Sequence, residues 1–209
     1  MSYEYSEEDG AFLVSLARDT VDKYVTHKIK HETPEIPSER LKVKSGVFVT
    51  LNVITGDHVS LRGCIGRPYP NQPLVQATID SAIDSAVHDP RFPPVSPKEL
   101  DSVLVELSVL TPPKKIEYAK PDDLLELIKV GRDGLIAVRD TWRGLLLPQV
   151  PVEWEWNTKE FLEHTCNKAG LPKDAWRDKR TEFMSFQAEI FGEEKPRGNI
   201  IRDPKHPRM

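Results

Sequence analysis

The sequence predicts an α+β fold in which antiparallel β-sheets pack against helices. Two kinds of pattern support this prediction. Apolar residues recur at steps of three and four in several separated segments, which is typical of amphipathic helices. Runs of β-branched and aromatic residues come in neighbouring pairs joined by short turns, which is typical of antiparallel hairpins. A chain of 209 residues is also long enough to bury a substantial core.

The first predicted helix begins after Ser6, whose hydroxyl can accept a hydrogen bond from the first turn. Three acidic residues follow it, where negative charge is favoured by the helix dipole. Two histidines at the far end, His27 and His31, have a spacing that would allow them to share a metal ion. No third ligand lies near them in the sequence, so a pair of solvated histidines is the preferred interpretation.

The next elements are two predicted strands, residues 47–51 and 59–67, which form an antiparallel hairpin across a short turn. Side chains alternate between faces along a strand, so Arg62 and Cys64 are expected on one face, about 6.5 Å apart along the chain. The register of the hairpin matters, because a slip of one residue would move both side chains to the other face.

The thiol of Cys64 has two interpretations. A guanidinium from Arg62 beside it would favour the thiolate, the form that attacks electrophiles. The flanking Gly63 and Gly66 would then leave room for another group to approach the backbone. The alternative is that Cys64 is a small buried hydrophobe and that the glycines mark a bulge.

A helix is predicted over residues 73–88. It is expected to end there, because a proline two positions later disfavours helical geometry in the residue before it. A charged cluster, His88, Asp89 and Arg91, lies at its end. These residues could supply a base or an anion clamp for Cys64. In the alternative, His88 caps the helix dipole while Asp89 and Arg91 hold the following loop in place.

Residues 103–110 form a strand that is apolar on one face and on most of the other, so it is expected to lie centrally in its sheet. Glu106 lies within this strand. A buried carboxylate needs a partner, and Arg62 or another arginine is an obvious candidate. Glu106 is therefore interpreted either as one half of a structural ion pair or as a catalytic acid.

The second half of the chain begins after a proline pair at 112–113. The elements predicted there are a helix over 121–131, a hairpin of strands 135–139 and 143–147, a helix capped by Asn157, and a last strand over 183–191. Cys166 falls on the apolar stripe of the capped helix and is predicted to be core. The expected buried face of the last strand consists of Met184, Phe186, Ala188 and Ile190.

Composition and charge exclude several classes of function. The formal charge of −4 argues against a broad nucleic-acid-binding surface. The two cysteines lie far apart and form neither a metal-binding pair nor a disulfide framework, which fits a reducing cytoplasm. The N-terminus is acidic, unlike a signal peptide, and no apolar run approaches the ~20 residues of a membrane span. We therefore expect a cytoplasmic protein with no metal, no cofactor, no membrane contact and no direct nucleic-acid binding.

The hexapeptide Leu61-Arg62-Gly63-Cys64-Ile65-Gly66, here called the signature hexapeptide, resembles that of the AMMECR family. The resemblance continues in family order through residues 89–95, 106–112, 134–136, 145–150, 166–171 and 186–191. It implies a larger lobe built from both chain ends, residues 1–112 and 179–209, and a smaller inserted α+β lobe at 113–178. It also implies a site near the interface of the lobes, and a modification pathway associated with Memo-like and radical-SAM proteins. It implies no particular reaction.

Two functions remain open at this point. The first is a small-molecule or modification enzyme whose interlobe cleft holds Cys64 as nucleophile, with Arg62 lowering its pKa or binding an anionic group. His88 or Glu106 would then carry the proton. The second is a non-catalytic module that docks a protein or a small-molecule ligand through the same surface. The expected ligand-binding residues are Gly63, Ile65, Gly66, Asp89 and Arg91.

Overall fold

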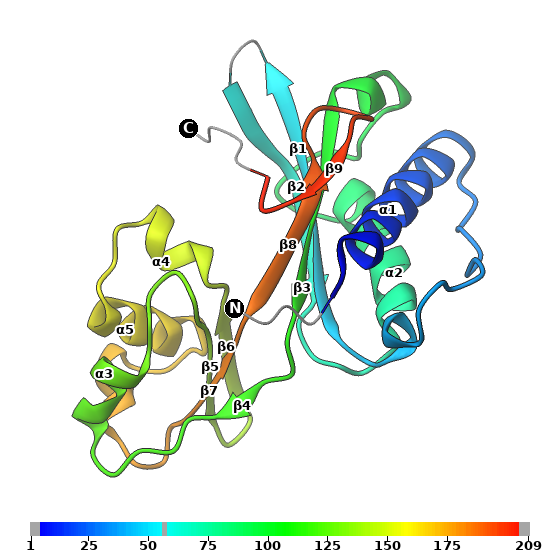
Figure 1. The fold of residues 1–209 in the computed structure, drawn as a ribbon. Helices are drawn as coiled ribbons and strands as arrows, with labels where there is room; N and C mark the ends of the chain where they lie inside the picture. The colour runs from blue at the N-terminus through cyan, green and yellow to red at the C-terminus, as the bar shows by residue number, and fades with distance from the viewer. Residues whose placement is uncertain (1–4, 56–57, 205–209) are drawn as a thin grey trace. The chain divides into compact units, whose positions relative to one another are not determined.

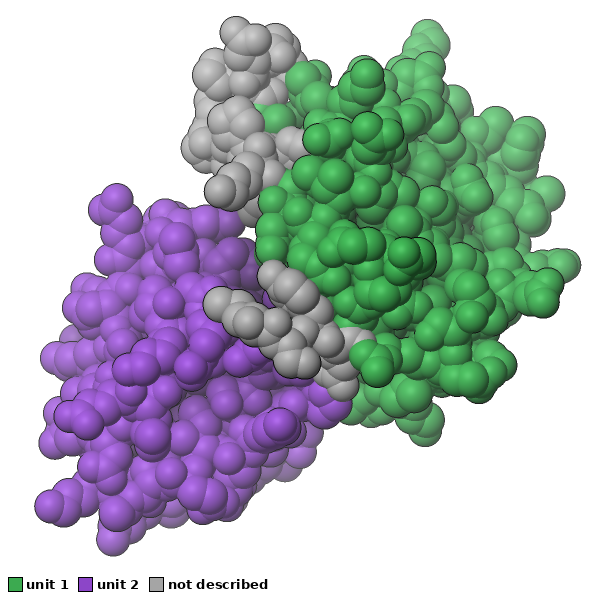
Figure 2. Space-filling model, viewed as in Figure 1, with its two compact units in different colours: residues 1–110, 189–209 green, residues 111–188 purple. Residues whose placement is uncertain are grey.

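The structure, a computed structural model, describes residues 5–55 and 58–204. The chain divides into two compact units, residues 1–110 with 189–209 and residues 111–188 (Figures 1 and 2). Each unit contains an antiparallel sheet packed with helices, so the predicted α+β class is confirmed. None of the described helices combines the length and the apolar character that crossing a membrane requires.

The first unit contains a five-stranded sheet with the strand order β2-β1-β3-β8-β9. Its strands are β1 (Gly46–Thr55), β2 (His58–Arg67), β3 (Val103–Leu110), β8 (Ala188–Glu193) and β9 (Ile200–Arg202). Its helices are α1 (Glu7–His27) and α2 (Leu74–Val87), with 3-10 turns η1 (Glu39–Lys42) and η2 (Pro97–Ser102). Both α-helices cover the same face of the sheet (Figure 1). The opposite face is called the far face below.

Local sequence signals determine where the two long helices begin and end. The amide of Asp9 donates to Ser6 Oγ at 3.1 Å, and the amide of Ser6 donates to Asp9 Oδ2 at 3.1 Å, so the predicted cap of α1 is confirmed. Helix α2 follows Pro73 and ends at Val87, with His88 as its C-cap, before the proline that disfavours helical geometry.

Alternation along β1 and β3 builds the core of the first unit. Val47, Val49 and Leu51 of β1 are fully buried against α1 and α2. In β3 every residue is buried, which agrees with the central position predicted for this strand. The residues between the core positions of β1 and β3 therefore face the far side of the sheet.

The second unit contains a four-stranded sheet with the order β4-β7-β5-β6. Its strands are β4 (Lys114–Lys115), β5 (Gly134–Arg139), β6 (Trp142–Leu146) and β7 (Glu182–Phe186). Its helices are α3 (Leu124–Leu127), α4 (Gln149–Glu153) and α5 (Thr158–Lys168), with 3-10 turns η3 (Pro121–Asp123) and η4 (Lys173–Arg177). The predicted hairpin is confirmed as β5 and β6, and Asn157 caps α5 by accepting from the amide of Glu160 at 3.0 Å.

Two predictions in this half are wrong in detail. The helix expected over 121–131 ends at Leu127, because Ile128 is extended. The single strand expected over 183–191 is two strands in different sheets, β7 and β8, separated by Gln187. The buried set changes accordingly, since Phe183 is fully buried and Glu189 is buried in place of Ile190.

The second unit extends to residue 188, whereas the inserted lobe was expected to end at residue 178. The difference arises because β7 pairs with both β4 and β5 and so completes the sheet of this unit. The division into two domains itself stays a prediction.

Candidate functional site

The signature hexapeptide lies in β2, at the edge of the five-stranded sheet. Residues 47–51 of β1 pair in regular register with β2 as far as Gly63, after which Asn52 pairs with Leu61. Arg62 occupies this β-bulge, and the alternation assumed in the sequence analysis is interrupted there.

Because of the bulge, Arg62 pairs with a different carboxylate from the one predicted. Its Nε donates to Glu99 Oε1 at 2.7 Å and its Nη1 donates to the carbonyl oxygen of Pro93 at 2.9 Å. The hydrogen bond from Arg62 lowers the pKa of Glu99 to about 2. The predicted pairing of Arg62 with Glu106 is therefore wrong, and Arg62 ties η2 and the proline-rich loop to β2.

The space left by the two glycines of the signature hexapeptide is filled by the protein itself. A Cβ on Gly63 would lie 2.1 Å from the carbonyl oxygen of Ser85 in α2. A Cβ on Gly66 would lie 2.3 Å from the ring of Phe48, its cross-strand neighbour. The glycines thus allow close packing of a helix on one face and of an aromatic ring on the other.

Ser85 also connects α2 to both strands of the hairpin. Its hydroxyl accepts from the amide of Ile65 at 2.8 Å and donates to the carbonyl of Val49 at 2.7 Å. The backbone of the signature hexapeptide is therefore held from the helix side by a buried polar contact, which is strong because it lies in a low-dielectric surrounding.

The backbone of Cys64 itself is held by the ion pair that follows α2. The amide of Cys64 donates to Asp89 Oδ2 at 2.8 Å, and Arg91 Nη2 donates to the carbonyl of Cys64 at 3.2 Å. Arg91 also pairs with Asp89 at 2.7 Å and holds the pKa of that buried carboxyl well below its usual value. Of the two interpretations of this pair, the geometry matches the one in which it holds local structure.

His88 contacts a carboxylate on its own helix. Its Nδ1 lies 2.8 Å from Asp84 Oδ1, and 60% of its side chain is exposed. Asp84 in turn accepts from Arg67 Nη2 at 2.8 Å. Among the described residues His88 makes no hydrogen bond to Cys64, and its role as a proton carrier stays a prediction.

On the far face, Cys64 belongs to a row of polar side chains that crosses three strands. Thr50 of β1 lies opposite Cys64 of β2 on one side and opposite Glu106 of β3 on the other. Residues that are directly opposite in an antiparallel pair have Cβ atoms about 4.5–5.5 Å apart and share a face. The Thr50 hydroxyl donates to Cys64 Sγ at 3.3 Å, while Glu106 is 2% exposed.

The pKa of Cys64 is raised, mainly because burial disfavours its charged form. The hydrogen bond from Thr50 and the charge of Arg91 act in the opposite direction, and the charges of Asp89 and Glu106 raise the pKa further. The expectation that Arg62 lowers this pKa is therefore wrong. In the resting protein Cys64 is a thiol.

Asn52 is the neighbour of Thr50 on the same face of β1, and sequence reasoning missed both residues. Asn52 is 3% exposed, and its Nδ2 has no hydrogen-bond partner among the described residues. A buried amide donor without a partner is costly and calls for an explanation, such as a ligand. We call Thr50, Asn52, Cys64 and Glu106 the far-face cluster. The sequence alone does not reveal this cluster, because its members come together only when the three strands pair.

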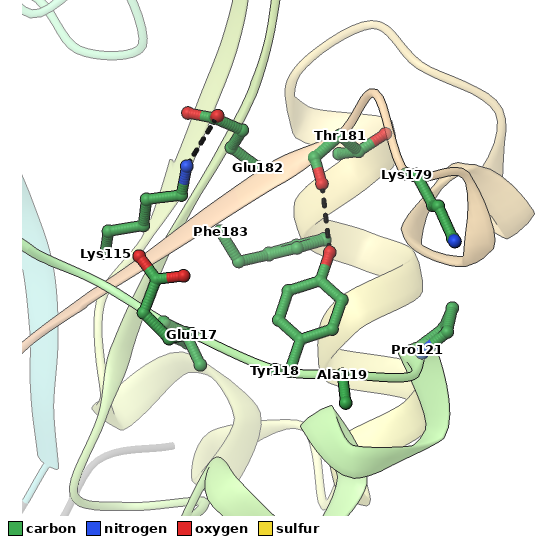
Figure 3. Close-up of a pocket in the computed structure, with 10 residues that line it drawn as sticks. Lys115, Glu117, Tyr118, Ala119, Pro121, Lys179, Thr181, Glu182 and Phe183 are labelled. Atoms are coloured by element: carbon green, nitrogen blue, oxygen red, sulfur yellow. Dashed lines mark hydrogen bonds and ion pairs between the residues drawn. The ribbon is translucent and has the colours of Figure 1, made fainter.

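A separate hollow of about 300 Å³ lies in the second unit (Figure 3). It opens where the segment after β4 diverges from β7, with Tyr118 between them and its hydroxyl donating to the carbonyl of Thr181 at 3.2 Å. The ion pair of Lys115 and Glu182, 2.7 Å apart, lies along one side. No sequence motif pointed to this hollow, because its lining comes from two segments far apart in the chain.

The described residues contain no group of three or more His, Cys, Asp and Glu side chains that could hold a metal ion. Cys166 is fully buried, as predicted, and its pKa is raised to about 11 by burial.

Comparisons with known proteins give a consistent result. Protein TK0174 of Thermococcus kodakarensis is 55% identical over 203 residues, which cover 97% of this chain and 98% of the relative. Protein PH0010 of Pyrococcus horikoshii is 53% identical over 205 residues, covering 98% and 99%. The crystal structure of PH0010, described as an uncharacterized protein, matches with a TM-score of 0.89 at 52% identity and covers 97% of this chain and 100% of that one. The AMMECR1 family model matches residues 14–191, and the chain belongs to this family.

Proposed function

We propose that this chain is an enzyme that transfers an acyl-type group from a small polar substrate, with Cys64 of the far-face cluster as nucleophile. The proposal is carried by one observation: a half-buried thiol, a hydroxyl and a buried carboxylate lie in one row across three strands, beside an amide donor that has no partner within residues 5–55 and 58–204. Nucleophile, proton carrier and donor to a substrate oxygen are the groups that such a transfer needs.

Proton transfer in this mechanism starts from a thiol, because the pKa of Cys64 is raised. The thiolate must therefore form as the substrate reacts, and a base has to accept the proton. Glu106 acts on the Cys64 pKa through its charge, and Thr50 lies between the two residues in the row. Glu106 is the proposed base.

The chemical step balances without a further reagent. The Cys64 sulfur forms a bond to the electrophilic carbon, and the bond from that carbon to the leaving group breaks. The proton lost by the thiol passes by way of Glu106 to the leaving group. Water or another nucleophile then takes the acyl group and restores the thiol. Asn52 Nδ2 donates to the oxygen that becomes negative during both attacks.

The residues around the row act as positioning residues in this proposal. Asp89 and Arg91 fix the backbone of Cys64, and Arg62 fixes the loop beside it. These contacts hold the sulfur in place at small entropic cost during the reaction.

A second candidate function is a non-catalytic module that binds a ligand or a protein, with Gly63, Ile65 and Gly66 in its surface. The raised pKa of Cys64 favours this alternative, because a protonated thiol is a weak nucleophile. The packing of Ser85 and Phe48 against the two glycines counts against a ligand that approaches the backbone there.

The test compares two reagents that both react with a thiol. Iodoacetamide alkylates sulfur without forming an oxyanion, whereas p-nitrophenyl acetate acylates it through an oxyanion. We expect Asn52→Leu to slow acetylation of Cys64 about 100-fold and to change alkylation little. Glu106→Gln should slow acetylation, although it makes the thiol more acidic.

The matched controls are Cys64→Ser, which should abolish the acetyl adduct, and Glu182→Gln, a surface carboxylate in the second unit that should change nothing. Peptide mass spectrometry locates the adduct, and thermal unfolding shows that each variant is folded. The enzyme proposal is wrong if folded Asn52→Leu and Glu106→Gln acetylate as fast as the parent protein.

A further inference from the structure

An exposed aromatic stack lies on the second unit. The indole of Trp154 is 67% exposed. It stacks on Trp156 with ring centroids 6.2 Å apart and planes inclined by 20°. Trp156 in turn stacks on His164 of α5, with centroids 3.7 Å apart and planes inclined by 1°. The stack therefore anchors an exposed ring on a helix.

The backbone after α4 holds the two tryptophans in this arrangement. The amide of Glu155 donates to the carbonyl of Val152 at 3.2 Å, and the amide of Trp156 donates to the carbonyl of Pro151 at 2.8 Å. This is the hydrogen-bond pattern of a Schellman motif, which places a left-handed residue between the two rings. That residue is Glu155, with φ 54°, at a position where glycine is usual.

The charges beside the stack are mainly negative. Glu155 is exposed, and among the described residues its carboxylate makes no ion pair. Glu160 lies one helical turn before His164 on α5, so it is on the same side of that helix. Lys168 lies one turn after His164 on the same helix. The residues around the stack thus include two carboxylates, of Glu155 and Glu160, and the cation of Lys168.

The molecule already uses contacts between cations and aromatic rings. The guanidinium of Arg177 lies 4.4 Å from the ring centroid of Trp176, and that of Arg202 lies 4.4 Å from the ring centroid of Phe191. Within residues 5–55 and 58–204, no cation lies over the ring of Trp154. An exposed indole followed directly in the chain by an exposed carboxylate that makes no ion pair within the described residues is complementary to a cation, because the ring face and the carboxylate are both negative.

We infer that Trp154 and Glu155 form a docking site for an arginine side chain in a basic segment of a partner protein. Arginine fits better than lysine, since its planar guanidinium can stack on the indole and donate two parallel hydrogen bonds to a carboxylate. The ring projects from the surface, so a free small cation would bury little of its own surface there. A peptide adds backbone and side-chain contacts around the anchoring arginine.

The probe for this site is a capped pentapeptide that contains two arginines separated by glycine. Its matched control replaces both arginines by citrulline, which has the same shape and no charge. The measurement is the set of indole N–H signals in a nitrogen-15 correlation spectrum, since the chain has four tryptophans. We expect the arginine peptide to shift the signals of Trp154 and Trp156 and to leave those of Trp142 and Trp176 in place.

Affinities of variants separate the site from the rest of the surface. Trp154→Ala should weaken binding about five-fold, and Glu155→Gln about three-fold. Trp142→Ala is the control, because Trp142 is also exposed, at 56%, but belongs to β6 and lies outside the stack. It should leave the affinity unchanged.

Three results would overturn the inference. Binding of the citrulline peptide as tight as that of the arginine peptide would show that charge plays no part. An equal loss of affinity in Trp142→Ala and Trp154→Ala would indicate nonspecific adsorption. A stronger shift of the same two indole signals by a short single-stranded oligonucleotide than by the peptide would identify the stack as a platform for bases. None of these outcomes depends on the chemistry of Cys64.

Discussion

The surroundings of the two cysteines differ, although burial raises the pKa of both. Cys166 lies in the apolar core of the second unit and is fully buried. Cys64 is half-buried at the edge of the first sheet, with the hydroxyl of Thr50 on its sulfur and the charge of Arg91 nearby. Burial alone therefore does not distinguish a core thiol from a candidate site. The distinction comes from the polar groups around Cys64 that lower its pKa against the effect of burial.

The largest expected effect is the difference in reactivity between the two thiols. In the native protein, iodoacetamide should modify Cys64 at least about 1,000-fold faster than Cys166, because exposure of Cys166 requires unfolding that costs about 5–15 kcal/mol. Peptide mass spectrometry over time measures both rates. In denaturant the two rates should converge, and similar rates in the native protein would remove the distinction.

Two glycine substitutions should each disrupt one of the two surroundings. Gly63→Ala places a Cβ 2.1 Å from the carbonyl oxygen of Ser85, and Gly144→Ala places one 2.2 Å from the amide nitrogen of Ala169. Each should lower the free energy of unfolding by about 3 kcal/mol. Chemical denaturation measures this effect.

The same two variants also test the comparison of the two cysteines through the rate at which each thiol is alkylated. Gly144→Ala should accelerate alkylation of Cys166 and leave Cys64 unchanged, because Gly144 packs on the end of α5, the helix that carries Cys166. Gly63→Ala should leave Cys166 protected. Equal acceleration of Cys166 by both variants would mean that the two units unfold as one.

A smaller effect concerns the pKa of Cys64. Thr50→Val removes a hydrogen bond that lowers this pKa, so the pKa should rise and alkylation at pH 8 should slow about three-fold. Glu106→Gln removes a charge that raises it, so alkylation should become faster. Rates measured from pH 6 to pH 10 give the pKa of each variant. Thr165→Val, next to Cys166, is the control and should leave the Cys64 profile unchanged.

The smallest effect on stability is its dependence on pH through the ion pair of Arg62 and Glu99. The pKa of Glu99 is lowered from 4.5 to about 2, chiefly by Arg62, so this pair stabilises the folded state above pH 4.5. That stability is lost as the pH falls through about 2. Arg62→Met should therefore cost about 1 kcal/mol at pH 7, after allowance for solvent screening.

The acid dependence itself can be measured by urea unfolding at several pH values. The difference between Arg62→Met and the parent protein should shrink steadily between pH 4.5 and pH 2. A constant difference over this range would mean that Arg62 acts through the packing of its apolar stem.

The sequence predicted the helices and the first hairpin because their signals are local. Ser6 is followed by its own capping partner, and the two strands of the hairpin adjoin a short turn. The strand over 183–191 was misjudged because alternation records which residues are apolar but not which sheet each half joins. Gln187, where the chain changes sheets, has no distinctive residue type.

The candidate site was predicted only in part, for a geometric reason. Cys64 and Glu106 were identified as chemically notable residues, but their relation depends on Thr50, which lies between them only when three strands are in register. The position of Arg62 depends on a bulge of one residue, which the neighbouring glycines indicated only as one of two alternatives. Asn52 was missed because its importance lies in an absent hydrogen bond.

The ion pair that follows α2 has a consequence for how copies of this protein meet. Strand β2 is ten residues long and forms an edge of its sheet, and such an edge offers backbone groups on which a foreign strand can grow into fibres. Asp89 and Arg91 occupy the outward amide and carbonyl of Cys64, midway along this edge. Both groups are therefore occupied at this point of the edge, where a strand from another copy would otherwise pair with them.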